Sequence, residues 1–248
     1  MAAWILSLTL LAVTAHAETA DEVIEKARAA NRVDSSIQTI KMTVVGKSGG
    51  ERSRELELRS RREGDVSKTY FRLTAPSDVA GTQLLLVDNP GQTDELSLYL
   101  PAYKKVNQVA GSARRGSFVG SDFSYEDFEV REAAAGKHTM VEDNADAWVI
   151  DTALDDADSS YTKIRATIRK ADLVAEKIEF YDKDGLLKVL EVGKTVKDNG
   201  VSLPVETDMT NVKKGTHTKL ESVSHELNVD KTKLPDETFT RSYLERGT

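Results

Sequence analysis

The chain has 248 residues, a formal net charge of −7 and no cysteine. The modest negative charge argues against a dedicated nucleic-acid-binding protein, because such proteins carry strongly basic surfaces. Without cysteine the chain has neither disulfides nor thiolate metal ligands, so the fold must rest on its own hydrophobic core.

Residues 1–17 have the pattern of a secretory signal peptide. An apolar run at residues 4–13 leads to Ala15-His16-Ala17, an A-x-A cleavage site directly before Glu18. The alternative is a short membrane anchor, but the run is shorter than the roughly 20 apolar residues that cross a bilayer. We therefore predict a cleaved signal peptide, a periplasmic location, and a single domain over residues 18–248 that is not transmembrane.

The first element predicted after the signal peptide is a helix. Thr19 and Glu22 form a capping-box pattern, and Val23, Ile24 and Ala27 follow at helical spacing.

Beyond this helix, apolar residues alternate with polar ones. The period of two occurs at residues 39–44, 55–59, 70–73, 95–100 and 163–169, which is typical of half-buried antiparallel strands. Turn-forming residues at 49–50, 63–65, 89–91, 182–185 and 198–200 separate the apolar runs. Strands that recur from Ile37 to about Leu227 predict a mainly β protein with few helices, built on a single curved antiparallel sheet or half-open barrel.

Residues 99–128 contain the most distinctive pattern of the chain. A loop at residues 111–117 carries Arg114 and Arg115 between glycines. Exposed backbone N–H groups and two guanidiniums suit a phosphate or carboxylate, so the loop is either an anion-binding nest or a solvated basic loop.

Four aromatic residues follow this loop: Phe118, Phe123, Tyr125 and Phe128. They either plug the end of the sheet as core or close a hydrophobic pocket as a lid, and both can hold if the pocket is the interior of a half-open barrel. We expect residues 121–128 to be helical, with Asp122 in the first turn, where a carboxylate complements the helix dipole.

The sequence lacks a catalytic or metal-binding signature. His138, His217 and His225 do not have the spacing of metal ligands. Residues 155–158 resemble part of a calcium loop but lack its glycine and distal glutamate, so a solvated turn is expected there. We predict a protein that is not an enzyme and needs no metal or cofactor.

Three stretches resemble the LolA-like outer membrane lipoprotein-sorting protein family. They are YFRLTAPSDVAGT at residues 70–82, LYLPA at 98–102 and GSFVGSDFSYED at 116–127. Shorter matches follow at residues 179–185, 209–211 and 239–240, so the resemblance covers nearly the whole chain after the signal peptide.

The resemblance implies a half-open antiparallel β-barrel with helical lid elements and a hydrophobic cavity for acyl chains. On this basis Leu96, Leu98 and Leu100 line the cavity, the four aromatics form its lid, and Arg114 and Arg115 meet a headgroup or membrane. A lid-engaging arginine of the family maps to Arg61 or Arg62, although the proline that follows it in the family is missing here.

The function implied is a periplasmic carrier or chaperone. Its partners would be lipid or lipoprotein acyl chains, with an inner-membrane RND-type exporter and an outer-membrane acceptor, and no nucleic acid. The alternatives are a lipid-sensing regulatory module, a structural interaction module with a packed barrel, and a lipid-modifying enzyme.

Overall fold

The computed structural model describes residues 17–89, 92, 94–128 and 136–246. The signal peptide prediction falls almost entirely outside these residues, as does part of the predicted turn at residues 89–91.

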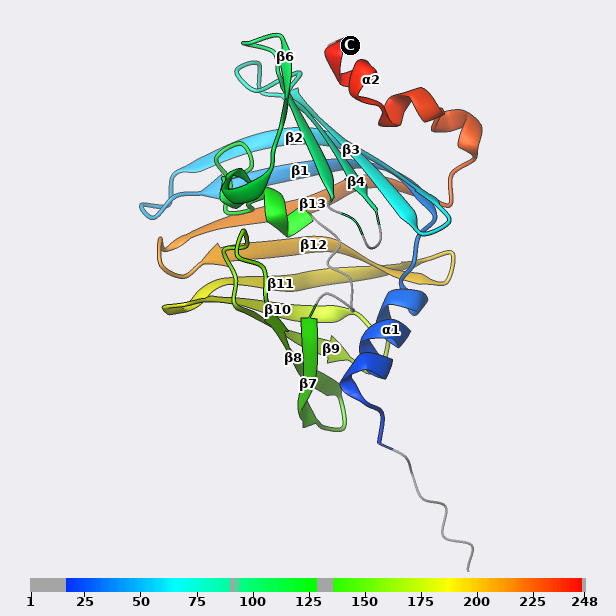
Figure 1. The fold of residues 1–248 in the computed structure, drawn as a ribbon, viewed down its shortest axis with the longest axis vertical. Helices are drawn as coiled ribbons and strands as arrows, with labels where there is room; N and C mark the ends of the chain where they lie inside the picture. The colour runs from blue at the N-terminus through cyan, green and yellow to red at the C-terminus, as the bar shows by residue number, and fades with distance from the viewer. Residues whose placement is uncertain (1–16, 90–91, 93, 129–135, 247–248) are drawn as a thin grey trace, which may run out of the picture.

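The described chain begins with helix α1 (Ala20–Ala30) and then forms strands in long succession (Figure 1). The strands are β1 (Ser35–Val45), β2 (Glu51–Glu63), β3 (Val66–Ala75), β4 (Gln83–Asp88), β5 (Glu95–Leu100), β6 (Lys105–Gln108), β7 (Gly136–Asp143), β8 (Ala147–Leu154), β9 (Lys163–Arg169), β10 (Ala175–Asp182), β11 (Gly185–Asp198), β12 (Val201–Asn211) and β13 (Thr216–Leu227). Short 3-10 turns are η1 (Gly111–Arg115), η2 (Tyr125–Phe128), η4 (Lys231–Lys233) and η5 (Asp236–Phe239), and helix α2 (Arg241–Glu245) follows.

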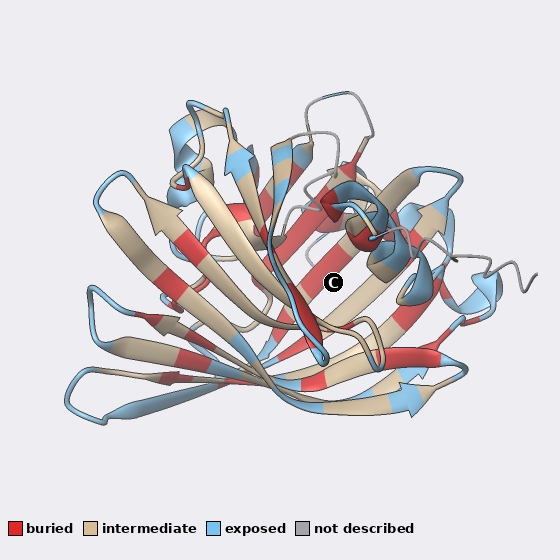
Figure 2. Cartoon of the chain, turned by 90° about the horizontal axis from the view of Figure 1, so that it is seen from below, coloured by how far each residue is buried: buried red, intermediate tan, exposed pale blue. Residues whose placement is uncertain are grey.

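All strands of the described chain belong to one antiparallel sheet, as the alternation of polar and apolar residues predicted. Its order is β6-β5-β4-β3-β2-β1-β13-β12-β11-β10-β9-β8-β7. Consecutive strands therefore pair with each other, except that β6 and β7 lie at opposite edges and β1 pairs with β13 as well as with β2. The sheet is curved and not closed (Figure 2).

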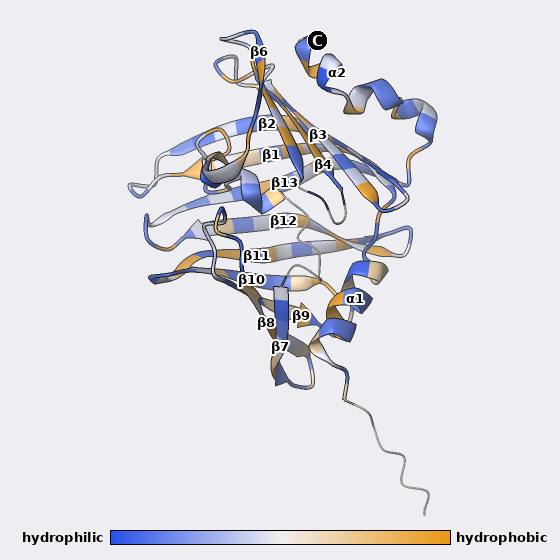
Figure 3. Ribbon diagram, in the orientation of Figure 1, coloured by the Kyte–Doolittle hydropathy of each residue, from blue (hydrophilic) through white to orange (hydrophobic). Residues whose placement is uncertain are grey.

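Hydrophobic residues recur among hydrophilic ones along the strands (Figure 3), and those on the concave face pack into one apolar cluster. Across β2 to β5 the partners Leu56 and Leu73, Phe71 and Leu84, and then Leu98 lie opposite one another on the same face. Each is at most 8% exposed, and burial of such a side chain stabilises the fold by about 1.5–3 kcal/mol.

Helix α1 covers the concave face at the β8–β9 end of the sheet. Val23 is fully buried and packs in one cluster with Trp148, Ile150 and Ile168. The predicted capping box is confirmed, because the Thr19 hydroxyl accepts a hydrogen bond from the Glu22 N–H and the Glu22 carboxylate accepts one from the Thr19 N–H. Among the described residues, no helix is both long and apolar enough to cross a membrane.

The convex face of β3 to β6 is covered by the C-terminal segment, residues 229–244. Leu234, Phe239 and Leu244 pack there against Tyr70 and Leu85. Strand β4 is thus buried on both faces, which explains its uninterrupted run Leu84-Leu85-Leu86.

The first prediction concerns this C-terminal segment. Because Leu234 is completely buried, Leu234→Ala should lower the free energy of unfolding by about 2–5 kcal/mol through lost burial and an unfilled cavity. Urea denaturation measures the change. Val223→Ala, at a residue 67% exposed, should stay within about 0.5 kcal/mol of wild type. A loss for Leu234→Ala as small as the control would mean that the segment is detachable.

Candidate functional site

The chain between β6 and β7 has to travel from one edge of the sheet to the other. Its described part, residues 109–128, lies in front of the concave face (Figure 1), and we call it the crossing segment. Val109, Phe118 and Phe123 are buried in the apolar cluster of that face. The crossing segment therefore covers the concave surface with its own apolar side chains.

The aromatic side chains of the crossing segment pack on one another and on the sheet. The Phe118 ring lies 5.0 Å from Phe128, 6.0 Å from Tyr125 and 6.2 Å from Phe71 of β3, measured between ring centroids. Phe123 stacks on Phe128 at 5.8 Å. The structure thus brings Phe118, Phe123, Tyr125 and Phe128 together with Leu96, Leu98 and Leu100 of β5 in a single cluster.

A tight turn inserts Phe118 and Phe123 into this cluster. The Phe118 N–H donates to the Phe123 carbonyl at 2.8 Å, and the Ser121 N–H donates to the Phe118 carbonyl at 2.9 Å. Val119 and Gly120 have φ angles of 43° and 74°, and the glycine suits this left-handed conformation because it has no Cβ.

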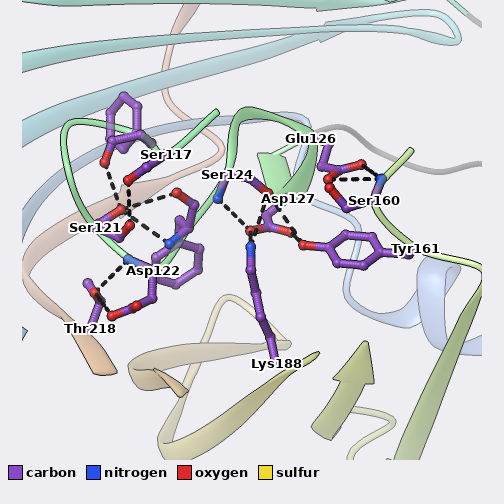
Figure 4. A network of polar contacts seen from close by, with 12 residues as sticks. Ser117, Ser121, Asp122, Ser124, Glu126, Asp127, Ser160, Tyr161, Lys188 and Thr218 are labelled. Atoms are coloured by element: carbon purple, nitrogen blue, oxygen red, sulfur yellow. Dashed lines mark hydrogen bonds and ion pairs between the residues drawn. The ribbon is translucent and has the colours of Figure 1, made fainter. Parts of the chain in front are cut away.

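The prediction of a helix over residues 121–128 is wrong for its first half, since only Tyr125–Phe128 form a 3-10 turn. Asp122 is not in a first helical turn. Its buried carboxylate accepts a hydrogen bond from the Thr218 hydroxyl of β13 at 2.8 Å (Figure 4) and one from the Thr216 hydroxyl of the same strand at 2.5 Å. The Asp122 carboxylate thus bonds to two threonine hydroxyls of a strand and not to the backbone N–H groups of a helix. These hydrogen bonds anchor this part of the crossing segment to the sheet.

A second anchor is a buried ion pair between the crossing segment and β11. Lys188 of β11 lies 2.9 Å from the Asp127 carboxylate and donates to the Ser124 hydroxyl at 3.1 Å (Figure 4). The Tyr161 hydroxyl donates to Asp127 at 2.5 Å. The Lys188 and Asp127 side chains are only 7% and 2% exposed, so each depends on the other for its charge to be tolerated.

Two tyrosines beside the ion pair are kept protonated. Burial raises the pKa of Tyr125, and burial together with the Asp127 carboxylate raises the pKa of Tyr161. Tyr161 therefore acts as a hydrogen-bond donor at all physiological pH values and is not a candidate base.

A third anchor joins the crossing segment to the β8–β9 connection. Glu126 accepts hydrogen bonds from the Ser159 hydroxyl at 3.0 Å and the Ser160 N–H at 3.1 Å. Arg115 donates to the carbonyls of Ala157 and Asp158 at 2.6 and 3.0 Å.

Arg114 also pairs with this connection, at 3.4 Å from Asp156. The basic loop predicted as an anion nest or a solvated loop is thus docked on residues 156–158. The turn predicted there as simply solvated supplies the acceptors.

The two arginines considered as lid-engaging residues lie elsewhere. Arg61 is 4% exposed and faces the C-terminal segment on the convex side, where it donates to the Leu234 carbonyl at 2.7 Å and pairs with Asp236 and Glu63. Arg62 donates to the Asp65 carbonyl at 3.3 Å. Among the described residues, neither forms a hydrogen bond or ion pair with the crossing segment.

Lys188 and Tyr161 were not among the site residues predicted from the sequence. The only available signal for Lys188 was a lysine inside the apolar run of β11, Leu186-Leu187-Lys188-Val189-Leu190. In the part of the chain that the structure describes, no three His, Asp or Glu residues gather in a way that could hold a metal ion.

A family model described only as "-like: Uncharacterized protein" matches residues 65–246, which is more than half of the chain. No curated protein matches the sequence. Among solved structures, a putative outer membrane lipoprotein-sorting protein domain from Vibrio parahaemolyticus is 28% identical with a TM-score of 0.85, covering 92% of this chain and 98% of its own.

Two further solved structures share the fold. A DUF1329 family protein from Desulfovibrio piger has a TM-score of 0.84 at 22% identity, with 91% of this chain and 97% of its own covered. A LolA superfamily protein from Nitrosomonas europaea has a TM-score of 0.71 at 19% identity, with 92% and 100% covered.

The second prediction tests the buried ion pair. Lys188→Ala leaves the Asp127 carboxylate buried without its cation and should lower the free energy of unfolding by about 3–5 kcal/mol. The double variant Lys188→Met with Asp127→Asn should recover much of that loss, because no charge is then left unpaired. Urea unfolding of the single and double variants gives the coupling energy.

Lys233→Met is the matched control for a surface pair. Lys233 and Glu226 are both more than half exposed, so this change should cost less than about 1 kcal/mol. If Lys188→Ala were equally mild, the crossing segment would not depend on the ion pair.

Proposed function

We propose, from the likeness to a putative outer membrane lipoprotein-sorting protein domain and from the sequence stretches that resemble the LolA-like family, that this chain is a non-enzymatic carrier or chaperone for the acyl chains of a lipid or lipoprotein. The ligand chains would lie on the concave face of the sheet, beneath the crossing segment. The predicted signal peptide at residues 1–17 supports a periplasmic location for this activity.

One observation supports the proposal above the others: the apolar concave surface is covered by a connection and not by another sheet. The described crossing segment is fastened mainly through side chains, namely Asp122, Glu126, Asp127 and Arg115. Its displacement leaves the strand pairing intact. A hydrogen bond contributes only about 1 kcal/mol net, so opening the cover costs less than unfolding the sheet.

The energy available from an acyl chain is sufficient to compete with this cover. Each buried methylene contributes about 0.8 kcal/mol, so a chain of a dozen carbons offsets the displacement of two or three aromatic side chains. In this picture Phe118, Phe123 and Phe128 occupy the surface while no ligand is bound, and acyl chains take their place.

Further steps of the proposal concern partners. We propose that the cargo comes from an inner-membrane exporter of the RND type and passes to an outer-membrane acceptor. Arg114 and Arg115 hold the closed cover on residues 156–158, and after its release they would meet a headgroup or membrane surface.

A structural interaction module is the second candidate. The burial of Phe118 at 1% and Phe123 at 6% exposure favours it, since these rings would then be permanent core. A lipid sensor is the intermediate case, in which a ligand binds but is not handed on.

The third prediction tests the carrier. Protein purified from its own periplasm should yield acylated species by native mass spectrometry and lipid extraction, and should bind a fluorescent fatty-acid probe. Leu100→Asn should weaken probe binding about tenfold, because half-buried Leu100 at the edge of the cluster then no longer offers apolar surface.

Val223→Asn provides the matched control, because Val223 is exposed and lies outside this cluster. Absence of both extractable lipid and probe binding would contradict the carrier and support the structural interaction module. Binding of lipid without its transfer to acceptor vesicles would contradict the carrier and support the lipid sensor.

A further inference from the structure

Among the described residues, one buried cation on the concave face has no hydrogen-bond or ion-pair partner. Arg54 of β2 is 8% exposed, and its Nε and Nη1 atoms are buried without a hydrogen-bond acceptor. It lies opposite Met42 of β1 and two residues before Leu56, so it shares the face of these two buried apolar side chains. Burial of a charged group without compensation is unfavourable.

The crossing segment passes directly over this arginine. A Cβ placed on Gly120 would lie 3.7 Å from Arg54 Nη2. The Val119–Gly120 turn therefore covers the guanidinium group. The other buried cations of the described chain are compensated: Lys188 pairs with Asp127, and Arg61 with Asp236 and Glu63.

The charged neighbours of Arg54 do not satisfy it. Arg52 lies two residues earlier on the same face, opposite Val44, and adds a second positive charge. Asp78 attracts Arg54 but forms no ion pair with it. Burial and the charge of Arg52 lower the pKa of Arg54, and Asp78 opposes this effect; an arginine nevertheless stays protonated in a protein.

Among the described residues, these contacts leave the Nε and Nη1 donors of Arg54 without an acceptor beside an apolar surface. Guanidinium groups bind carboxylate and phosphate through two parallel hydrogen bonds. The neighbouring side chains Met42, Leu56 and Leu73 are at most 3% exposed and belong to the cluster under the crossing segment. An anionic group and a hydrocarbon chain in one molecule would match both features at once.

We propose that Arg54, assisted by Arg52, binds the acidic headgroup, carboxylate or phosphate, of an amphiphile whose hydrocarbon chain lies on the concave face. The inference rests on the proposed carrier function and narrows its ligands to acyl compounds with an anionic end. The Val119–Gly120 turn then covers the headgroup, and the aromatic part of the crossing segment gives way to the chain.

The test compares ligands that differ only in the headgroup. Binding of laurate, dodecanol and inorganic phosphate is measured by isothermal titration calorimetry. Wild type should bind laurate about tenfold or more tightly than dodecanol, as expected for charge-assisted hydrogen bonds in a buried site, and should bind phosphate weakly. Arg54→Gln should abolish this preference for laurate. The affinity for dodecanol should change less than about twofold, because effects on independent parts of a ligand agree within about 0.5 kcal/mol.

Two further variants separate binding from structure. Arg59→Gln lies on the same strand but on the opposite face, where Arg59 pairs with Glu57, and it should keep the preference for laurate. Arg54→Lys should retain part of it, since the charge remains but the planar fork is lost. Without ligand, Arg54→Gln should not lower the melting temperature, because it removes an uncompensated charge.

The outcomes are distinct. Equal affinity of wild type for laurate and dodecanol, or a preference that survives in Arg54→Gln, would overturn the headgroup site and leave the carrier proposal standing. Tight phosphate binding that no hydrocarbon chain improves would overturn the amphiphile assignment. If neither laurate nor dodecanol binds, the carrier proposal and this site fall together.

Discussion

The pairing of the first strand with the last is the constraint on which the rest of the structure depends. Because β1 hydrogen-bonds to β13, the consecutive strands β6 and β7 become opposite edges of the sheet. Their connection must then cross the open side of the curve. The apolar side chains of the described part of this connection, among them Val109, Phe118 and Phe123, are buried against the concave face. The cover over the candidate site is thus a consequence of strand order.

Polar contacts decide how that cover is held. Along the crossing segment, buried carboxylates alternate with aromatic rings, and each carboxylate finds its own donor: Thr216 and Thr218 for Asp122, Ser159 and Ser160 for Glu126, and Lys188 for Asp127. Such contacts add little net stability compared with apolar packing. They fix one position of the segment, however, and a position fixed by few contacts can be given up when a ligand supplies apolar surface.

Arg54 stands apart from this pattern. Each buried carboxylate described above has its donors, Lys188 has its acceptors, and Arg61 has acceptors at both terminal nitrogens although its Nε has none. Among the described residues, Arg54 has no acceptor at Nε or Nη1 and no ion pair. A buried polar group without a hydrogen-bond partner is rare in native folds and calls for an explanation, such as a catalytic role or a bound ion or water. On the described part of the concave face, the buried carboxylates that hold the crossing segment have hydrogen-bond donors, whereas Arg54 lacks acceptors. The first feature suits closure of the crossing segment over the face, and the second suits recognition of a ligand.

The sequence by itself determined the local features of this protein. Alternation along each strand, the capping box at Thr19 and Glu22, and the apolar side chains of Leu96 and Leu98 are expressed within a few residues, so periodicity reveals them. The hydrogen-bond and ion-pair partners of the buried side chains follow only from the tertiary structure. Asp127 and Lys188 are 61 residues apart, Asp122 and Thr216 are 94 apart, and Arg61 and Leu234 are 173 apart. Which charged side chains meet depends on which strands become neighbours in the curved sheet. A local sequence pattern carries no information about that choice of neighbours.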